Sequence, residues 1–160
     1  MFVIFCSGIL DCPTIFTDIS WYIKVNKNIV DKISINKIND KYIGFHYRNT
    51  DMKHELESFI PEILDLSKQY NKLYLGTDDY TAFDRLSNLI KNKLNIIQYT
   101  KPINLGGKNI HYGNQNKDEV IMNILIDMYH FIHATYFIPS KKSSVSLRVM
   151  QWRKKDEFFE

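Results

Sequence analysis

The chain has 160 residues, of which 44% are hydrophobic and 14% are aromatic, and its 21 basic and 18 acidic side chains give a formal net charge of +3. This length and apolar content predict one folded domain with a sizeable core and exclude a disordered chain. The small net charge, with basic and acidic residues interleaved, argues against a nucleic-acid-binding face.

The amino-terminal region carries few signals. Cys6 and Cys12 are the chain's two cysteines, too few for a disulfide framework or a zinc site. The apolar run 2–10 is too short to cross a bilayer and no basic residue precedes it, so we interpret residues 1–20 as an extension, a strand or the remnant of a preceding domain. A degenerate signal sequence is the alternative. No other apolar run approaches membrane length, so we expect a soluble protein, with the cytoplasm favoured.

The rest of the chain predicts helices and strands in alternation. Apolar side chains at helical spacing predict helices over 24–38 and 54–70, over the segment around Phe83 to Ile90, from about 117 through 132, and over 145–153. Short runs of β-branched, aromatic and aliphatic residues predict strands at 42–47, 73–75, 95–99 and 135–138. Pro61 fits only the first turn of its helix. Turn residues mark a loop over 101–116 and a polar turn over 140–144.

This alternation predicts an α/β fold, a Rossmann-like three-layer parallel sheet covered by helices on both faces. The domain would span residues 21–153, and residues 154–160 would form a charged tail. Polar clusters follow three of the strands, at 46–51, 77–79 and 140–144, and carboxyl ends of parallel strands are where such folds bind ligands. None of the clusters is a dinucleotide fingerprint or a Walker loop, so NAD enzymes and P-loop NTPases are disfavoured. The guanidinium of Arg48 matches phosphate oxygens as a bidentate donor and indicates a phosphate-bearing substrate.

Together the clusters resemble the nucleotide-sugar domain of the α1,6-fucosyltransferase family, which also includes the nodulation fucosyltransferases. The family's His-Val-Arg-Arg-Thr-Asp is similar to His46-Tyr47-Arg48-Asn49-Thr50-Asp51, and its Ala-Thr-Asp-Asp is similar to Gly76-Thr77-Asp78-Asp79. The family's third motif is a helix with an aspartate, then a strand, a Ser/Thr-rich turn and a short helix. It is matched by Asp127 and the segments 135–138, 140–144 and 145–151. The resemblance covers about residues 20 to 152.

The resemblance implies the carboxyl-terminal half of a GT-B glycosyltransferase, with GDP-fucose as donor, a glycan as acceptor, and no metal or other cofactor. Arg48 would be the catalytic residue, holding the β-phosphate and stabilising the charge that develops as GDP leaves. Asp127 would contact the guanine or its ribose, and Ser143 would bind phosphate at the start of the last helix. The implied donor-binding residues are His46, Asn49, Asp51, Thr77, Asp78, Asp79, Asp127, Ser140, Ser143 and Ser144.

Two departures stand beside this resemblance. Asn49 occupies the position of the family's second arginine, and a lost charged hydrogen bond costs ~1.5–3 kcal/mol. A complete GT-B enzyme also has two Rossmann-like domains with the acceptor bound between them, whereas this chain has room for one. The amino-terminal domain is then missing, or is supplied by a partner domain or chain, or the protein is a degenerate nucleotide-sugar-binding module without catalysis.

Each candidate residue also has a structural interpretation. Arg48 would then pair with Asp51, His46 would orient its loop, and the aspartates 78–79 and serines 143–144 would cap the helices that follow them. A third function is a metal-dependent hydrolase or other enzyme using Asp78, Asp79 and His130. Asp127, His130 and His133 lie at three-residue intervals, but such positions drift around a helix and lack a fourth ligand, so a structural role is favoured.

Overall fold

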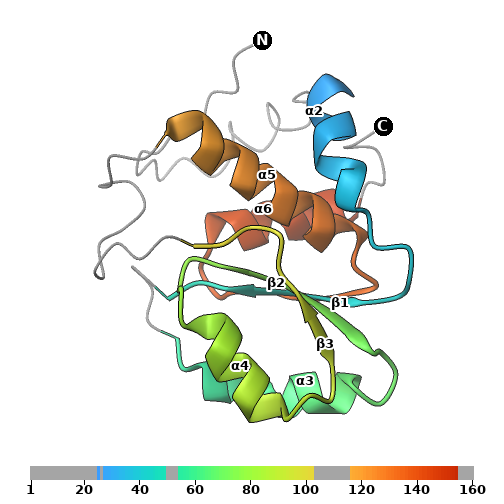
Figure 1. The fold of residues 1–160 in the computed structure, drawn as a ribbon, viewed down its shortest axis with the longest axis vertical. Helices are drawn as coiled ribbons and strands as arrows, with labels where there is room; N and C mark the ends of the chain where they lie inside the picture. The colour runs from blue at the N-terminus through green and yellow to red at the C-terminus, as the bar shows by residue number, and fades with distance from the viewer. Residues whose placement is uncertain (1–24, 26, 50–53, 103–115, 155–160) are drawn as a thin grey trace.

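A parallel sheet forms the middle layer of the computed structural model, which describes residues 25, 27–49, 54–102 and 116–154 (Figure 1). Its strands are β1 (Ile43–Tyr47), β2 (Lys72–Thr77), β3 (Asn95–Ile97) and β4 (Tyr136–Ile138), in the order β3-β2-β1-β4. All three pairings are parallel. The predicted α/β, Rossmann-like three-layer fold is confirmed.

The alternation of side chains along the strands builds a separate apolar core on each face of this sheet. Ile43, Phe45 and Tyr47 of β1 point to one face, where they pack against the helices α3 (Ile60–Leu66) and α4 (Ala82–Ile90). Tyr42 and Tyr74 point to the other face, toward α5 (Lys117–His133) and α6 (Ser144–Trp152). Figure 1 shows the helix α2 (Lys27–Ile33) on the same side as α5 and α6.

Several helices are shorter than the apolar spacing predicts. The expected helix over 24–38 is α2 followed by a 3₁₀ turn, η1 (Ser34–Asn36), and the expected helix over 54–70 is the 3₁₀ turn η2 (Leu56–Phe59) followed by α3. Pro61 lies in the first turn of α3, where its missing N–H has no helical partner to lose. The third predicted strand ends at Ile97 rather than at residue 99.

Helix α5 and the residue after it pack directly on two glycines of the sheet. A Cβ at Gly44 would come within 2.9 Å of the Ala134 Cβ, and a Cβ at Gly76 would come within 2.4 Å of the Phe131 ring. These two strand residues point toward α5, so their missing side chains set how deeply the helix packs. His46, paired with Gly76 across the two strands, lies on this face as well.

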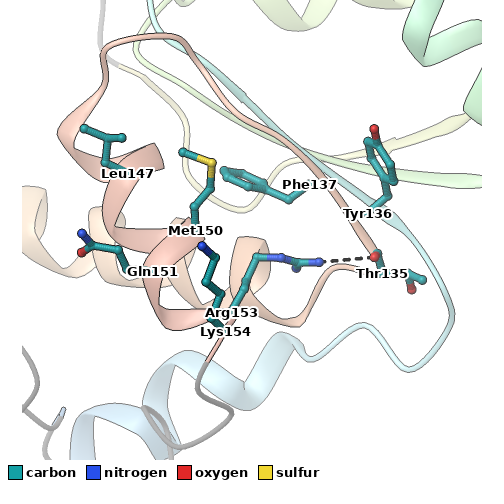
Figure 2. Close-up of a pocket in the computed structure, with 8 residues that line it drawn as sticks. All are labelled: Thr135, Tyr136, Phe137, Leu147, Met150, Gln151, Arg153 and Lys154. Carbon is teal, nitrogen blue, oxygen red and sulfur yellow. Dashed lines mark hydrogen bonds between the residues drawn. The ribbon is translucent and has the colours of Figure 1, made fainter.

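The carboxyl end of α5 is fastened by an arginine from the end of α6. The Arg153 guanidinium donates hydrogen bonds to the carbonyls of Phe131 (2.8 Å) and Ile132 (2.9 Å), and also to that of Ala134. A further bond goes to the carbonyl of Thr135 at 3.3 Å (Figure 2). Cations suit a helix carboxyl terminus because the last carbonyls have no helical partners. The contact ties the end of α5 and the start of β4 to α6.

The strand order creates a switch point at the carboxyl edge of the sheet. From β1 the chain moves outward to β2 and then β3, and then crosses back through α5 to place β4 on the other side of β1. A crevice at such a reversal, outside the carboxyl ends of the strands, is where open α/β sheets bind ligands. The residues after β1 and β4 therefore define the candidate site.

Some expectations fall on parts of the chain that are not described. The extension 1–20, most of the loop over 101–116 and the tail beyond residue 154 lie outside the described residues. Within the described ranges no helix is both long enough and apolar enough to span a bilayer.

Candidate functional site

The loops after β1 and β4 meet at the switch point. The Arg48 backbone N–H donates to the Ser140 hydroxyl at 3.3 Å, and the Ser140 N–H in turn donates to the Ser146 hydroxyl on α6 at 3.0 Å. These bonds hold the first turn of α6 against the end of β1. Because Ser140 lies two residues after the end of β4, the strand pairing brings it to Arg48 although 92 positions separate the two residues.

His46 lies near the end of β1, on the face of the sheet that packs against α5. Its Nδ1 lies 2.7 Å from the Ser146 hydroxyl, and its ring lies against Phe131. Burial, with the neighbouring Arg48 charge, lowers the pKa of His46 to about 3, so the imidazole is neutral at physiological pH. The direction of this bond depends on the tautomer of the neutral imidazole, because the Ser146 hydroxyl can both donate and accept.

The loops after β1 and β2 are tied together by Asn49. Its backbone N–H donates to Asp78 Oδ1 at 2.7 Å and its side-chain amide donates to Asp79 Oδ2 at 2.8 Å. The His54 N–H also approaches the Asn49 side-chain oxygen, at 3.4 Å. Asn49 therefore joins the loop after β1 to the loop after β2. This role differs from binding phosphate, which the family's second arginine would do.

Arg48 and Asp78 form a loose ion pair across the same two loops. The Arg48 Nε lies 3.9 Å from Asp78 Oδ2, and the two side chains are 21% and 13% exposed. The guanidinium is thus at the carboxyl edge of the sheet and within reach of solvent. Asp51, the partner that the structural interpretation assigned to Arg48, lies with Thr50 outside the described residues.

Asp79 organises the turn that leads into α4. Its Oδ1 accepts hydrogen bonds from the backbone N–H and the hydroxyl of Thr81, at 2.9 and 2.7 Å, and its Oδ2 lies 3.7 Å from Arg85. Thr77 accepts from the Asp79 N–H at 3.0 Å. Burial raises the pKa of Asp79, but the bonds from Thr81 and Asn49 and the Arg85 charge outweigh it and hold the pKa below its usual value. The Asp79 carboxylate thus holds Thr81, the N-cap residue of α4, whose own side chain makes no cap bond, so the predicted capping of this helix by the side chain of Asp79 is not what the structure has.

Asp127 projects from α5 over the end of β2. Its Oδ1 accepts hydrogen bonds from the Tyr74 hydroxyl at 2.7 Å and from the Thr100 hydroxyl at 2.6 Å. Burial raises the pKa of Asp127 to about 7, and the two hydrogen bonds lower it against that trend. This carboxyl group therefore changes charge near neutral pH, which is common at functional sites.

The serines at the start of α6 divide into buried and exposed ones. Ser140 and Ser143 are buried, and the Ser143 side chain caps α6 by accepting from the Ser146 N–H at 3.5 Å. Ser144 is exposed at the first position of the helix. The cap predicted as the structural role of the serines is formed by Ser143.

The structure thus brings most of the predicted site residues to one edge of the sheet. These are His46, Arg48, Asn49, Thr77, Asp78, Asp79, Asp127, Ser140, Ser143 and Ser144. A separate hollow of about 650 Å³ beside β4 and α6 contains none of them (Figure 2). It is lined by Thr135, Tyr136, Phe137, Leu147, Met150, Gln151, Arg153 and Lys154.

Sequence reasoning missed three residues that position this site. Ser146 bonds to His46, and Tyr74 and Thr100 bond to Asp127. Ser146 lies three residues after Ser143 on the same helix face, a spacing that is visible in the sequence. Thr100 follows the third strand, so its place beyond a strand end was an available signal, whereas Tyr74 looks like any aromatic core residue.

The histidines of α5 do not gather with the acidic residues of the site. His130 is fully buried and stacks on Tyr74 at 4.3 Å between ring centroids, and neither of its ring nitrogens has a hydrogen-bond partner among the described residues. Burial, with the nearby His133, lowers the pKa of His130 to about 4. In the part of the chain that is described, no three His, Cys, Asp or Glu side chains lie close enough together to hold a metal ion.

Comparison with known proteins adds one relative. No protein-family model matches this sequence. The chain is 28% identical over 126 residues to GDP-fucose protein O-fucosyltransferase 2 of Caenorhabditis elegans, and the alignment covers 72% of this chain and 27% of that protein. The chain is fucosyltransferase-like in sequence. It spans about a quarter of the length of this relative.

Proposed function

We propose that this chain is a nucleotide-sugar-binding domain of a fucosyltransferase-like glycosyltransferase, equivalent to the carboxyl-terminal half of a GT-B enzyme, with GDP-fucose as its donor. The observation that carries the proposal is the meeting of Arg48, Asp78 and Ser140 at the switch point of the sheet. A parallel α/β sheet binds its ligand at this place. The similarity to an O-fucosyltransferase supports the same donor class.

In the proposed reaction an acceptor hydroxyl oxygen bonds to the anomeric carbon of the sugar while the bond from that carbon to the β-phosphate oxygen breaks. GDP leaves with the bonding electrons and so gains negative charge, and the hydroxyl proton passes to solvent. Arg48 offers a guanidinium at the edge of the sheet, held by its backbone bond to Ser140 and by the Asp78 carboxylate. A positioned cation stabilises charge that develops on a leaving phosphate without reorganising during the step. The proposal assigns that role to Arg48, so it requires no metal cofactor. A glycan acceptor and the wall that binds it would come from a partner domain or chain.

Removing the guanidinium tests this role. With isothermal titration calorimetry we expect Arg48→Ala to weaken GDP binding by about tenfold or more, because a charged hydrogen bond is worth ~1.5–3 kcal/mol. Guanosine binding, which involves no phosphate, should change little. Arg148→Ala is the matched control, because Arg148 contacts Gln151 and Trp152 on α6. A folded wild-type chain that gives no heat with millimolar GDP would overturn the proposal.

A second candidate function is a nucleotide-sugar-binding module that does not catalyse transfer. Asn49 favours it, because this residue replaces a cation of the resembling family and its amide is committed to Asp79. Both candidates predict GDP binding. Transfer of fucose from GDP-fucose to a glycan by this chain on its own would exclude the second.

A further inference from the structure

The turn that follows β4 carries two lysines beside Arg48. Lys141 and Lys142 are both exposed, whereas Ser140 before them and Ser143 after them are buried. The Ser140 hydroxyl accepts a hydrogen bond from the Arg48 backbone N–H at 3.3 Å, so this turn begins at the residue that contacts the end of β1. The two lysines therefore extend from a segment that is anchored at the candidate site.

The backbone of this turn is held at its ends and in its middle. The Ser143 N–H donates to the Ser140 carbonyl at 3.4 Å, which closes a four-residue turn. The Lys141 carbonyl oxygen lies 3.2 Å from Nε2 of His54, and because a carbonyl can only accept, the His54 ring is the donor. These bonds fix the points on the backbone from which the lysine side chains extend.

Lys142 has a backbone conformation that lysine seldom adopts. Its φ of 59° lies in the left-handed region, where Cβ is crowded against the backbone. A turn whose third residue has a positive φ normally has Gly or Asn there. Glycine would relax this turn but would remove an ammonium group from the edge of the sheet. Strained residues of this kind are common at ligand-binding sites.

The lysines add positive charge to an edge whose other charges are already paired. Arg48 lies beside the carboxylate of Asp78, and Asn49 is neutral. Within the described ranges neither Lys141 nor Lys142 forms an ion pair with a carboxylate. Since the charges of Arg48 and Asp78 offset each other, the lysines determine the net charge that an anion meets here.

We propose that Lys141 and Lys142 bind the diphosphate of the donor and supply the positive charge that the neutral Asn49 lacks. The inference rests on the proposed function for its ligand and names the residues that complete the phosphate-binding part of that site. The second cation then comes from the turn after β4 instead of the loop after β1. Lysine suits this place because its ammonium group is a compact charge with three donors on a flexible stem.

Calorimetry with GDP tests the proposed contact. Lys141→Ala and Lys142→Ala should each weaken GDP binding by about threefold, and the double variant by about tenfold, because exposed charges contribute less than buried ones. Guanosine binding should be the same in all four proteins. Added salt should weaken GDP binding more in the wild type than in the double variant. A folded double variant that binds GDP as tightly as the wild type would overturn the proposal.

Lys91 provides a matched control at the other end of α4. It is also exposed and also has a positive φ, of 50°, but it caps the carboxyl end of that helix, away from the carboxyl ends of the strands. Lys142→Gly and Lys91→Gly each remove one charge and one strained φ, so neither should lower the urea midpoint. Lys142→Gly alone should weaken GDP binding. Equal losses of GDP affinity in the two variants would overturn direct contact.

Inorganic pyrophosphate separates failure of this inference from failure of the proposed function. If the wild-type chain binds neither GDP nor pyrophosphate, both fail. If it binds pyrophosphate but not GDP, and the double variant loses that binding, the lysines bind diphosphate and the proposed function fails. If GDP binds equally well to the wild type and the double variant, the proposed function stands and this inference fails.

Discussion

Asn49 illustrates how one residue can serve the framework of a site at the expense of its charge. It joins the loops after β1 and β2 through Asp78 and Asp79, and it accepts from the backbone of His54. Asp78 also pairs with Arg48, and Asp79 pairs with Arg85. Opposite charges therefore surround the neutral side chain of Asn49. An arginine at this position would add a positive charge to the candidate site but would lose the hydrogen bonds of the Asn49 side chain.

We therefore expect Asn49→Arg to bind GDP more tightly than wild type by about tenfold, the counterpart of a charged hydrogen bond to phosphate. The same change should lower the free energy of unfolding by ~1 kcal/mol, because the bonds of the amide to Asp79 and His54 are lost. Calorimetry and urea unfolding measure the two effects. Asn49→Ala is the control that loses the bonds without gaining a cation, and equal GDP affinity in the two variants would contradict the prediction.

At the scale of elements, the packing of α5 on the sheet decides both stability and the place of Asp127. Gly44 and Gly76 lie on neighbouring strands and both admit α5, yet only Gly76 lies under the Asp127 carboxyl group. The close approach at Gly44 involves Ala134 and Phe131 instead. The two glycines are thus similar in their packing and different in their distance from the candidate site.

Adding one methyl group at each position separates these roles. Gly44→Ala and Gly76→Ala should each lower the free energy of unfolding by ~1–3 kcal/mol, because the new Cβ overpacks the interface with α5. Gly76→Ala should in addition shift the Asp127 titration midpoint and weaken guanosine binding, whereas folded Gly44→Ala should keep both. Urea unfolding, NMR and calorimetry provide the measurements. Equal effects of the two substitutions on guanosine would show that Asp127 does not depend on Gly76.

At the scale of the whole molecule, one sheet supplies the side chains of both cores. Ile43 and Phe45 fill one face of β1, while Tyr42 and the neighbouring Tyr74 fill the other. Neither core can persist after the strands separate, since the same strands form a wall of each. We expect a single unfolding transition in urea, with coincident curves from the far-ultraviolet signal of the backbone and the near-ultraviolet signal of the buried tyrosines. Two separate midpoints would contradict this prediction.

The order and type of the elements could be predicted because local patterns determine them. Strands such as 42–47 and helices such as the one beginning at 117 have periodic apolar positions, and the parallel arrangement follows from their alternation. The breaks at η1 and η2 could not be predicted from spacing alone, since apolar residues continue through them. At η2, Pro61 fits only the first turn of α3, and this determines where the regular helix begins.

The candidate site was predictable to the extent that strand ends mark it. Arg48, Thr77 and Ser140 lie at or just beyond the carboxyl ends of strands, so the parallel sheet brings them to one edge. Their bonds were not predictable, because they depend on tertiary contacts between distant segments. The link from Asp127 to Thr100 and Tyr74 and the use of Ser143 as a helix cap required the structure.

The contact between Arg48 and Ser140 has a consequence for the order in which the protein can form. During translation β1 is synthesised long before β4 and α6. One edge of β1 therefore has no strand partner until β4 has emerged from the ribosome. The bonds that join the end of β1 to the first turn of α6 can form only when Ser140 and Ser146 have emerged. We therefore expect the candidate site to be complete only after α6 has emerged, and a nascent chain that stops before α6 would lack the contacts of Ser146 with His46 and Ser140.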